Sequence, residues 1–115
     1  MSWYLASLVF QIHISSHHTK QQFETQWRLV EAETEKGAYE KLQLLGLQEQ
    51  DSFVNDKNQI VQWEFIGTPN IQKLDNLNNG IKLLSNIIEP EEGIQYRTFI
   101  IERSKANEIK YEGFA

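Results

Sequence analysis

The segment of residues 3–14 constrains the fold more than any other part of the chain. It is rich in β-branched and aromatic residues and contains neither proline nor glycine, a composition that predicts a long β-strand. Side chains alternate between the two faces of a strand, and one face here is apolar throughout: Tyr4, Ala6, Leu8, Phe10 and Ile12. The opposite face is only half polar: Trp3, Leu5, Ser7, Val9, Gln11 and His13. The first face is the predicted core face.

A second strand is predicted over residues 23–33, after a short polar loop. Two long strands joined by such a loop are expected to pair as an antiparallel hairpin. A helix is predicted next, over residues 35–45, with Thr34 as its N-cap because a hydroxyl can accept a hydrogen bond from a first-turn amide. Gly46 is its expected end. The apolar stripe that should pack on the sheet contains Ala38, Leu42 and Leu45.

A second hairpin is predicted from residues 52–54, a turn over residues 55–58, and a return strand over residues 59–66. Val61, Trp63 and Phe65 share one face of the return strand, and we expect Trp63 and Phe65 to form the floor under the helix. Pro69 ends this strand, because it has no amide proton to donate.

The C-terminal third gives weaker patterns. Residues 71–77 favour a short strand or extended segment, and residues 81–88 a further strand. A helix is expected after Pro90, although residues 98–101 have strand-like composition. Residues 106–115 look like a loosely attached tail. The predicted fold is therefore α+β over a single domain of residues 1–115: an antiparallel sheet of two hairpins plus a further strand, one main helix on one face, and a C-terminal helix.

Composition excludes several classes of function. The chain has 115 residues and no cysteine, so neither disulfides nor a thiolate metal site is expected. Its net charge is 11 − 16 = −5, which argues against binding to nucleic acid. Residues 1–14 have no basic leader and become polar too soon to cross a bilayer. We expect a cytoplasmic protein that binds neither nucleic acid nor membrane.

The histidines His13, His17 and His18 do not predict a metal site. His17 and His18 are adjacent, and no acidic or thiol ligand stands at a zinc-like spacing from them. The sequence also lacks a glycine-rich phosphate loop, a nucleophile elbow and a dinucleotide fingerprint. No cofactor is expected, and the absence of these signatures leans against an enzyme.

Charged residues inside the predicted strands form a candidate polar patch: Arg28, Glu31, Glu33 and Glu64. The favoured interpretation is outward-facing ion pairs of small energetic worth. The alternative is a polar pocket around Arg28, Glu31 and Glu64 that binds a ligand or performs acid–base chemistry.

A candidate interface consists of Trp3, Leu5, Val9 and Trp27. A sheet with one solvated face should show cleaner polar alternation than these strands do. We therefore expect the second sheet face to be covered, either by a later segment or by another copy of the chain. A homodimer or other homo-oligomer is the predicted assembly, and another protein is a possible partner.

Four segments occur in an order that resembles a known family: residues 3–6 (WYLA), 28–32 (RLVEA), 51–55 (DSFVN) and 61–67 (VQWEFIG). Together they look like the small bacterial proteins of domain-of-unknown-function family 4288, over roughly residues 3–88. The resemblance implies a bacterial, cytoplasmic, single-domain protein of about this length, and it implies no activity or catalytic residue.

Three functional hypotheses follow. The leading one is a non-enzymatic module that acts through protein–protein contact or self-association. The alternative is a small ligand-binding protein or enzyme that uses the polar pocket. A further alternative is an immunity or antitoxin-type protein, because many of these are small and acidic and act by covering a surface.

Overall fold

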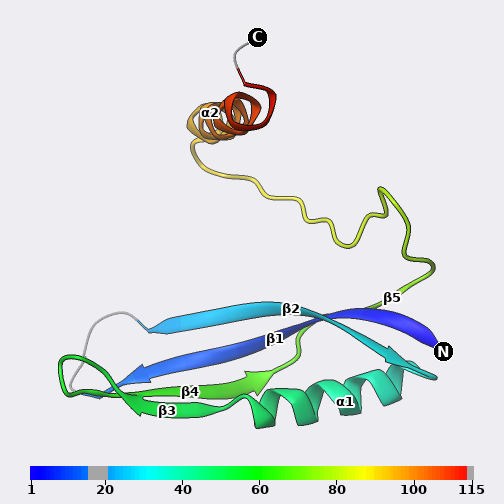
Figure 1. Ribbon diagram of the computed structural model, residues 1–115, viewed down its shortest axis with the longest axis vertical. Coiled ribbons are helices and arrows are strands. Elements are labelled where there is room, and N and C mark those ends of the chain that lie inside the picture. The colour runs from blue at the N-terminus through cyan, green and yellow to red at the C-terminus, as the bar shows by residue number, and fades with distance from the viewer. Residues whose placement is uncertain (16–20, 114–115) are drawn as a thin grey trace. The chain divides into compact units, whose positions relative to one another are not determined.

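The computed structural model describes residues 1–15 and 21–113 and has an α+β fold. The chain divides into two compact units, Met1–Leu83 and Leu84–Ala115. Among these described residues, the first unit contains an antiparallel sheet and one helix, and the second contains one helix (Figure 1).

The sheet contains five strands: β1 (Ser2–Ile14), β2 (Gln22–Ala32), β3 (Asp51–Val54), β4 (Ile60–Gly67) and β5 (Ile71–Leu74). Four of them run in the order β2-β1-β4-β3, and β5 pairs with β1 as well. β1 is therefore the central strand, with β2 on one side and both β4 and β5 on the other. Both predicted hairpins are confirmed, with β1 paired to β2 and β3 paired to β4.

Helix α1 (Glu35–Gln48) packs on the face of the sheet predicted as the core face. Ala6, Leu8 and Phe10 of β1 meet Leu42 of α1 in a cluster that excludes water almost completely. Trp63 and Phe65 pack against this cluster, as predicted for the floor under the helix. A smaller cluster joins Tyr4, Ala32 and Ala38 at the start of α1.

The N-terminus of α1 is capped as predicted. The Thr34 hydroxyl accepts a hydrogen bond of 3.0 Å from the amide of Gly37, which satisfies one of the unpaired donors of the first turn. The predicted end at Gly46 is wrong, because α1 continues to Gln48. Gly46 instead provides space: a Cβ atom there would lie 2.6 Å from the ring of Phe65.

The second hairpin turns through a polar loop. The side-chain oxygen of Asn55 accepts hydrogen bonds from the amides of Lys57 and Gln59, a local arrangement typical of asparagine in turns. Asn58 has a φ of 61°, a left-handed conformation that asparagine tolerates better than most residues. The turn residues therefore explain why the chain reverses at this point.

A break between β4 and β5 is closed by a buried polar contact. The pairing register of β1 with β4 shifts between Val9 and Phe10, as in a β-bulge. Beyond it, Ser7 is fully buried and bonds Asn70 three times, through its amide, and through its hydroxyl as both donor and acceptor. These bonds satisfy the buried hydroxyl and hold the chain against β1 where the ladder is interrupted.

The short strand expected after Pro69 is confirmed as β5, whereas the strand expected over residues 81–88 is wrong. This segment has strand-like composition, but it joins no ladder among the described residues, and a strand needs a neighbour for its backbone groups.

The second unit contains the predicted C-terminal helix, α2 (Gly93–Glu112). Residues 106–112, expected as part of a loose tail, continue this helix. Gly113 ends it with a φ of 71°, and its amide donates to the carbonyl of Ile109. No residue of α2 is buried, so its apolar side chains contribute nothing to a core within this unit.

We predict that Gly46→Ala lowers the free energy of unfolding by about 1–2 kcal/mol, because the new methyl group must displace the Phe65 ring. That ring packs 5.5 Å from the ring of Phe10, centroid to centroid, and has little freedom to move. Urea denaturation measures the change. Gly93→Ala is the matched control, because a Cβ atom there meets nothing within 4 Å. Equal effects of the two substitutions would contradict the steric explanation.

We also predict that Thr34→Ala lowers the free energy of unfolding by about 1 kcal/mol, because the Gly37 amide loses its acceptor. Thermal unfolding followed by circular dichroism detects the loss. Thr34→Ser retains the hydroxyl and should stay close to the original protein. A serine variant as unstable as the alanine variant would show that the methyl group, and not the cap, is what matters.

Candidate functional site

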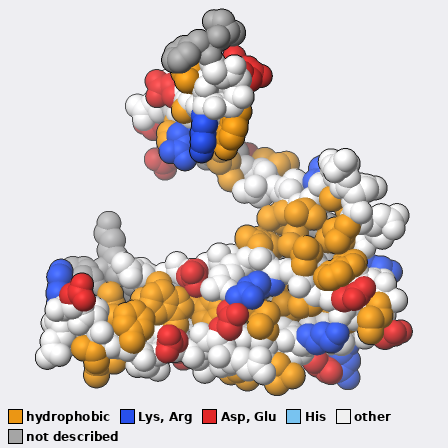
Figure 2. Space-filling model, viewed as in Figure 1, with side chains coloured by type: hydrophobic (Ala, Val, Ile, Leu, Met, Phe, Trp, Pro, Cys, Tyr) orange, Lys and Arg blue, Asp and Glu red, His pale blue; other side chains and the backbone are white. Residues whose placement is uncertain are grey.

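The face of the sheet opposite α1, called here the open face, carries exposed apolar side chains. It contains the odd-numbered residues of β1 and β2, which lie opposite one another across the ladder: Trp3 with Glu31, Leu5 with Leu29, Ser7 with Trp27, Val9 with Thr25, and Gln11 with Phe23. Trp27 is 42% exposed, Leu29 44% and Phe23 53%. Hydrophobic side chains are visible at the surface of this unit in Figure 2.

The four residues of the predicted interface, Trp3, Leu5, Val9 and Trp27, all belong to the open face. They are not equally available, because Leu5 is only 6% exposed whereas Trp3 and Trp27 reach the surface. Sequence reasoning left out Phe23 and Leu29. The signal for them was present, since both share the strand parity of Trp27.

A shallow apolar depression lies beside Val9, lined also by Ile66, Gly67, Thr68 and Pro69. It forms where the bulge between β4 and β1 interrupts the regular pleat. Ile66, on the same face of β4 as Glu64, is exposed at its rim. The depression thus continues the apolar part of the open face from β2 and β1 onto β4.

The predicted polar patch is divided between the two faces. Arg28 lies opposite Ala6, on the side of α1, where its guanidinium donates to Gln26 and pairs with Glu49 just after α1. Glu31 and Glu64 lie on the open face. The structure therefore does not bring Arg28 together with Glu31 and Glu64 in one pocket.

The remaining acidic residues have separate environments. Glu64 accepts a hydrogen bond from His13 at 2.8 Å across β1 and β4, and both side chains are close to half exposed. Glu33 is exposed just after β2. These arrangements are surface pairs or single charges, which contribute little to stability and provide no desolvated carboxylate for acid–base chemistry.

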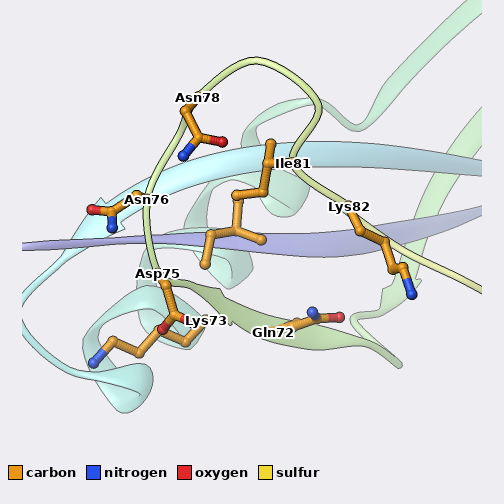
Figure 3. A pocket seen from close by; sticks show the side chains of 8 residues that line it. Gln72, Lys73, Asp75, Asn76, Asn78, Ile81 and Lys82 are labelled. Carbon is orange, nitrogen blue, oxygen red and sulfur yellow. The ribbon is translucent and has the colours of Figure 1, made fainter.

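A second depression follows β5 and is lined mainly by polar residues of the loop that begins at Asp75 (Figure 3). Asn76, Asn78 and Ile81 border it, while the amino groups of Lys73 and Lys82 extend to opposite sides. Because its two cations diverge, the depression has no convergent charge with which to hold an anion.

Metal binding has no support in the part of the chain that is described. No group of three or more histidine, cysteine, aspartate or glutamate side chains gathers within residues 1–15 and 21–113. His13 bonds Glu64, and the other two histidines considered from the sequence, His17 and His18, lie outside the described residues. In those same ranges, no helix combines the length and apolar character needed to cross a membrane.

The open face can bind another apolar surface, since burying its exposed side chains removes hydrocarbon from water. Its polar members, Thr25, Gln11 and Glu64, stand among the apolar ones and can set the orientation of a partner.

The comparisons with known proteins agree with this division of the chain. The family model described as "Domain of unknown function (DUF4288)" matches residues 3–85. This range contains α1 and the five strands apart from Ser2, the first residue of β1, and it ends close to the boundary of the first compact unit. Neither the curated proteins nor the solved structures gave a match. Because the matched range covers most of the sequence, the chain belongs to the DUF4288 family.

Proposed function

We propose that this protein is a non-enzymatic, self-associating module that binds a second copy of itself through its sheet. The observation that carries this proposal is the group of exposed apolar side chains on the open face, including Trp3, Phe23, Trp27 and Leu29. In a single chain these residues leave a large hydrocarbon area in water.

Their arrangement supports association more than their number does. Scattered exposed apolar residues are normal in soluble proteins, but adjoining ones mark surfaces that bind partners. Phe23, Trp27 and Leu29 project from the same face of one strand, and Leu5 lies directly across from Leu29. They therefore form one surface.

The positions of the charged residues also favour a binding role over catalysis. Arg28 is engaged by Gln26 and Glu49 on the α1 side, and Glu64 is engaged by His13. The charges thus hold elements of the fold together and do not converge on a substrate. We also propose that the protein is cytoplasmic. The chain has no cysteine, so it forms no disulfide that would require an oxidising compartment.

We predict that Leu29→Gln weakens self-association by about tenfold or more, because each copy loses apolar area that becomes buried between copies. Size-exclusion chromatography with light scattering over a range of concentrations measures the change against the 13.5 kDa monomer.

Leu44→Gln is the matched control. Leu44 lies on α1 and is 61% exposed, so the same substitution removes a similar side chain outside the open face. The control should associate like the original protein. A chain that stays monomeric at every concentration, or a control as weak as the Leu29 variant, would overturn the proposal.

A further inference from the structure

Strand β2 forms one edge of the sheet and pairs only with β1 among the described strands. It is 11 residues long and contains neither proline nor lysine, two residues that commonly protect an edge from pairing with another strand, and its charged residues are Glu24, Arg28 and Glu31. A long, regular edge of this kind offers its free backbone groups to a further strand.

One hydrogen bond made by β1 and one made by β2 show which backbone groups of β2 point away from β1. The amide of Ser7 donates to Asn70, away from β2, so Ser7 and its opposite residue Trp27 form a pair without mutual backbone bonds. The carbonyl of Glu31 likewise points away from β1, because it accepts a bond from the Lys41 amino group. The free groups therefore belong to the odd-numbered residues of β2: Phe23, Thr25, Trp27 and Leu29.

This parity limits how a second β2 can pair antiparallel. Residues that exchange backbone hydrogen bonds lie opposite each other in an antiparallel pair, so an odd-numbered residue of one β2 must lie opposite an odd-numbered residue of the other. The two-fold axis then passes through a residue of β2 and not between two residues. An axis through Arg28 would oppose two guanidinium groups, which is unfavourable. An axis through Gln26 opposes Glu24 of each copy with Arg28 of the other, so symmetry gives two contacts between opposite charges. These contacts add to the bonds within each copy, where Glu24 accepts from Gln26 and Trp63 and Arg28 bonds Gln26 and Glu49.

The same axis also matches the open face. It places Phe23 of each copy opposite Leu29 of the other, and Thr25 opposite Trp27. Two apolar side chains, Phe23 and Leu29, then meet on the open face, and the methyl group of Thr25 can meet Trp27. The charged pairs lie on the α1 side, where Arg28 already sits. Charge and hydrophobicity therefore favour the same register.

We propose that two copies of this protein pair edge to edge through antiparallel β2 strands, with a two-fold axis at Gln26, and so join their sheets into one. This inference rests on the proposed self-association and identifies the surface that performs it. The paired sheet brings the exposed apolar residues of both open faces side by side, and each β2 gains hydrogen bonds from backbone groups that otherwise face water.

Charge reversal tests the register. Glu24→Arg creates two Arg–Arg contacts in a homodimer, and Arg28→Glu creates two Glu–Glu contacts. Each variant alone should dimerise at least about tenfold more weakly, since both cross-strand pairs change from attraction to repulsion. Mixed in equal amounts, the two variants should recover dimers, because both contacts in the mixed pair are again between opposite charges.

Glu40→Arg is the control for the Glu24 variant, because it makes the same change at an exposed residue of α1, outside both the β2 edge and the open face. It should leave dimerisation unchanged. If the two β2 variants fail to recover dimers on mixing while Leu29→Gln still weakens association, the copies bind through their open faces and the edge pairing is wrong. Monomers in every sample would overturn both proposals.

Amide hydrogen exchange in the unaltered protein provides a test that no substitution can disturb. Pairing about Gln26 makes the amides of Phe23, Thr25, Trp27 and Leu29 donors to the second copy. Their exchange, measured by nuclear magnetic resonance, should slow by about tenfold or more as the protein concentration passes the dimer dissociation constant. Exchange at these four amides that is fast at all concentrations would rule out the edge pairing, even if dimers form.

Discussion

The rest of the structure depends on the burial of one face of β1 beneath α1. Ala6, Leu8 and Phe10 on the strand and Leu42 on the helix exclude water from their contact. β1 is also the strand with which β2, β4 and β5 all pair. The apolar alternation of a single strand thus fixes both the position of the helix and the common axis of the sheet, because any slip of one residue would turn the core face to solvent.

That arrangement has a consequence for the opposite face. Within its described residues the first unit has one helix, and a helix can cover only one face of a sheet. Leu5 and Ser7 are buried on the open face, but Trp27, Leu29 and Phe23 at the β2 side remain in contact with water. The proposed assembly would pair the strand that carries these residues, so that the exposed edge and the exposed apolar side chains are accounted for together.

The charged residues serve the fold in ways that sequence position did not reveal. Arg28 joins the edge strand to Glu49 at the end of α1, and Lys41 reaches from the same helix to the backbone of Glu31. On the other side of the sheet His13 pairs with Glu64. Arg28 and Glu64, both inside strands, thus make contacts between neighbouring elements of the fold.

The sequence by itself determined the two hairpins, the start of α1, the Thr34 cap and four members of the open face, because these follow from local alternation, helical spacing and the chemistry of single residues. Tertiary structure decided what local patterns could not. Gly46 does not end α1 but lies inside it, and its missing side chain leaves space for the ring of Phe65. Residues 81–88 have the composition of a strand, but no neighbouring strand pairs with them within the described chain. Arg28 and Glu64 lie on opposite faces because the β1–β2 and β1–β4 registers, which are long-range properties, set their parity.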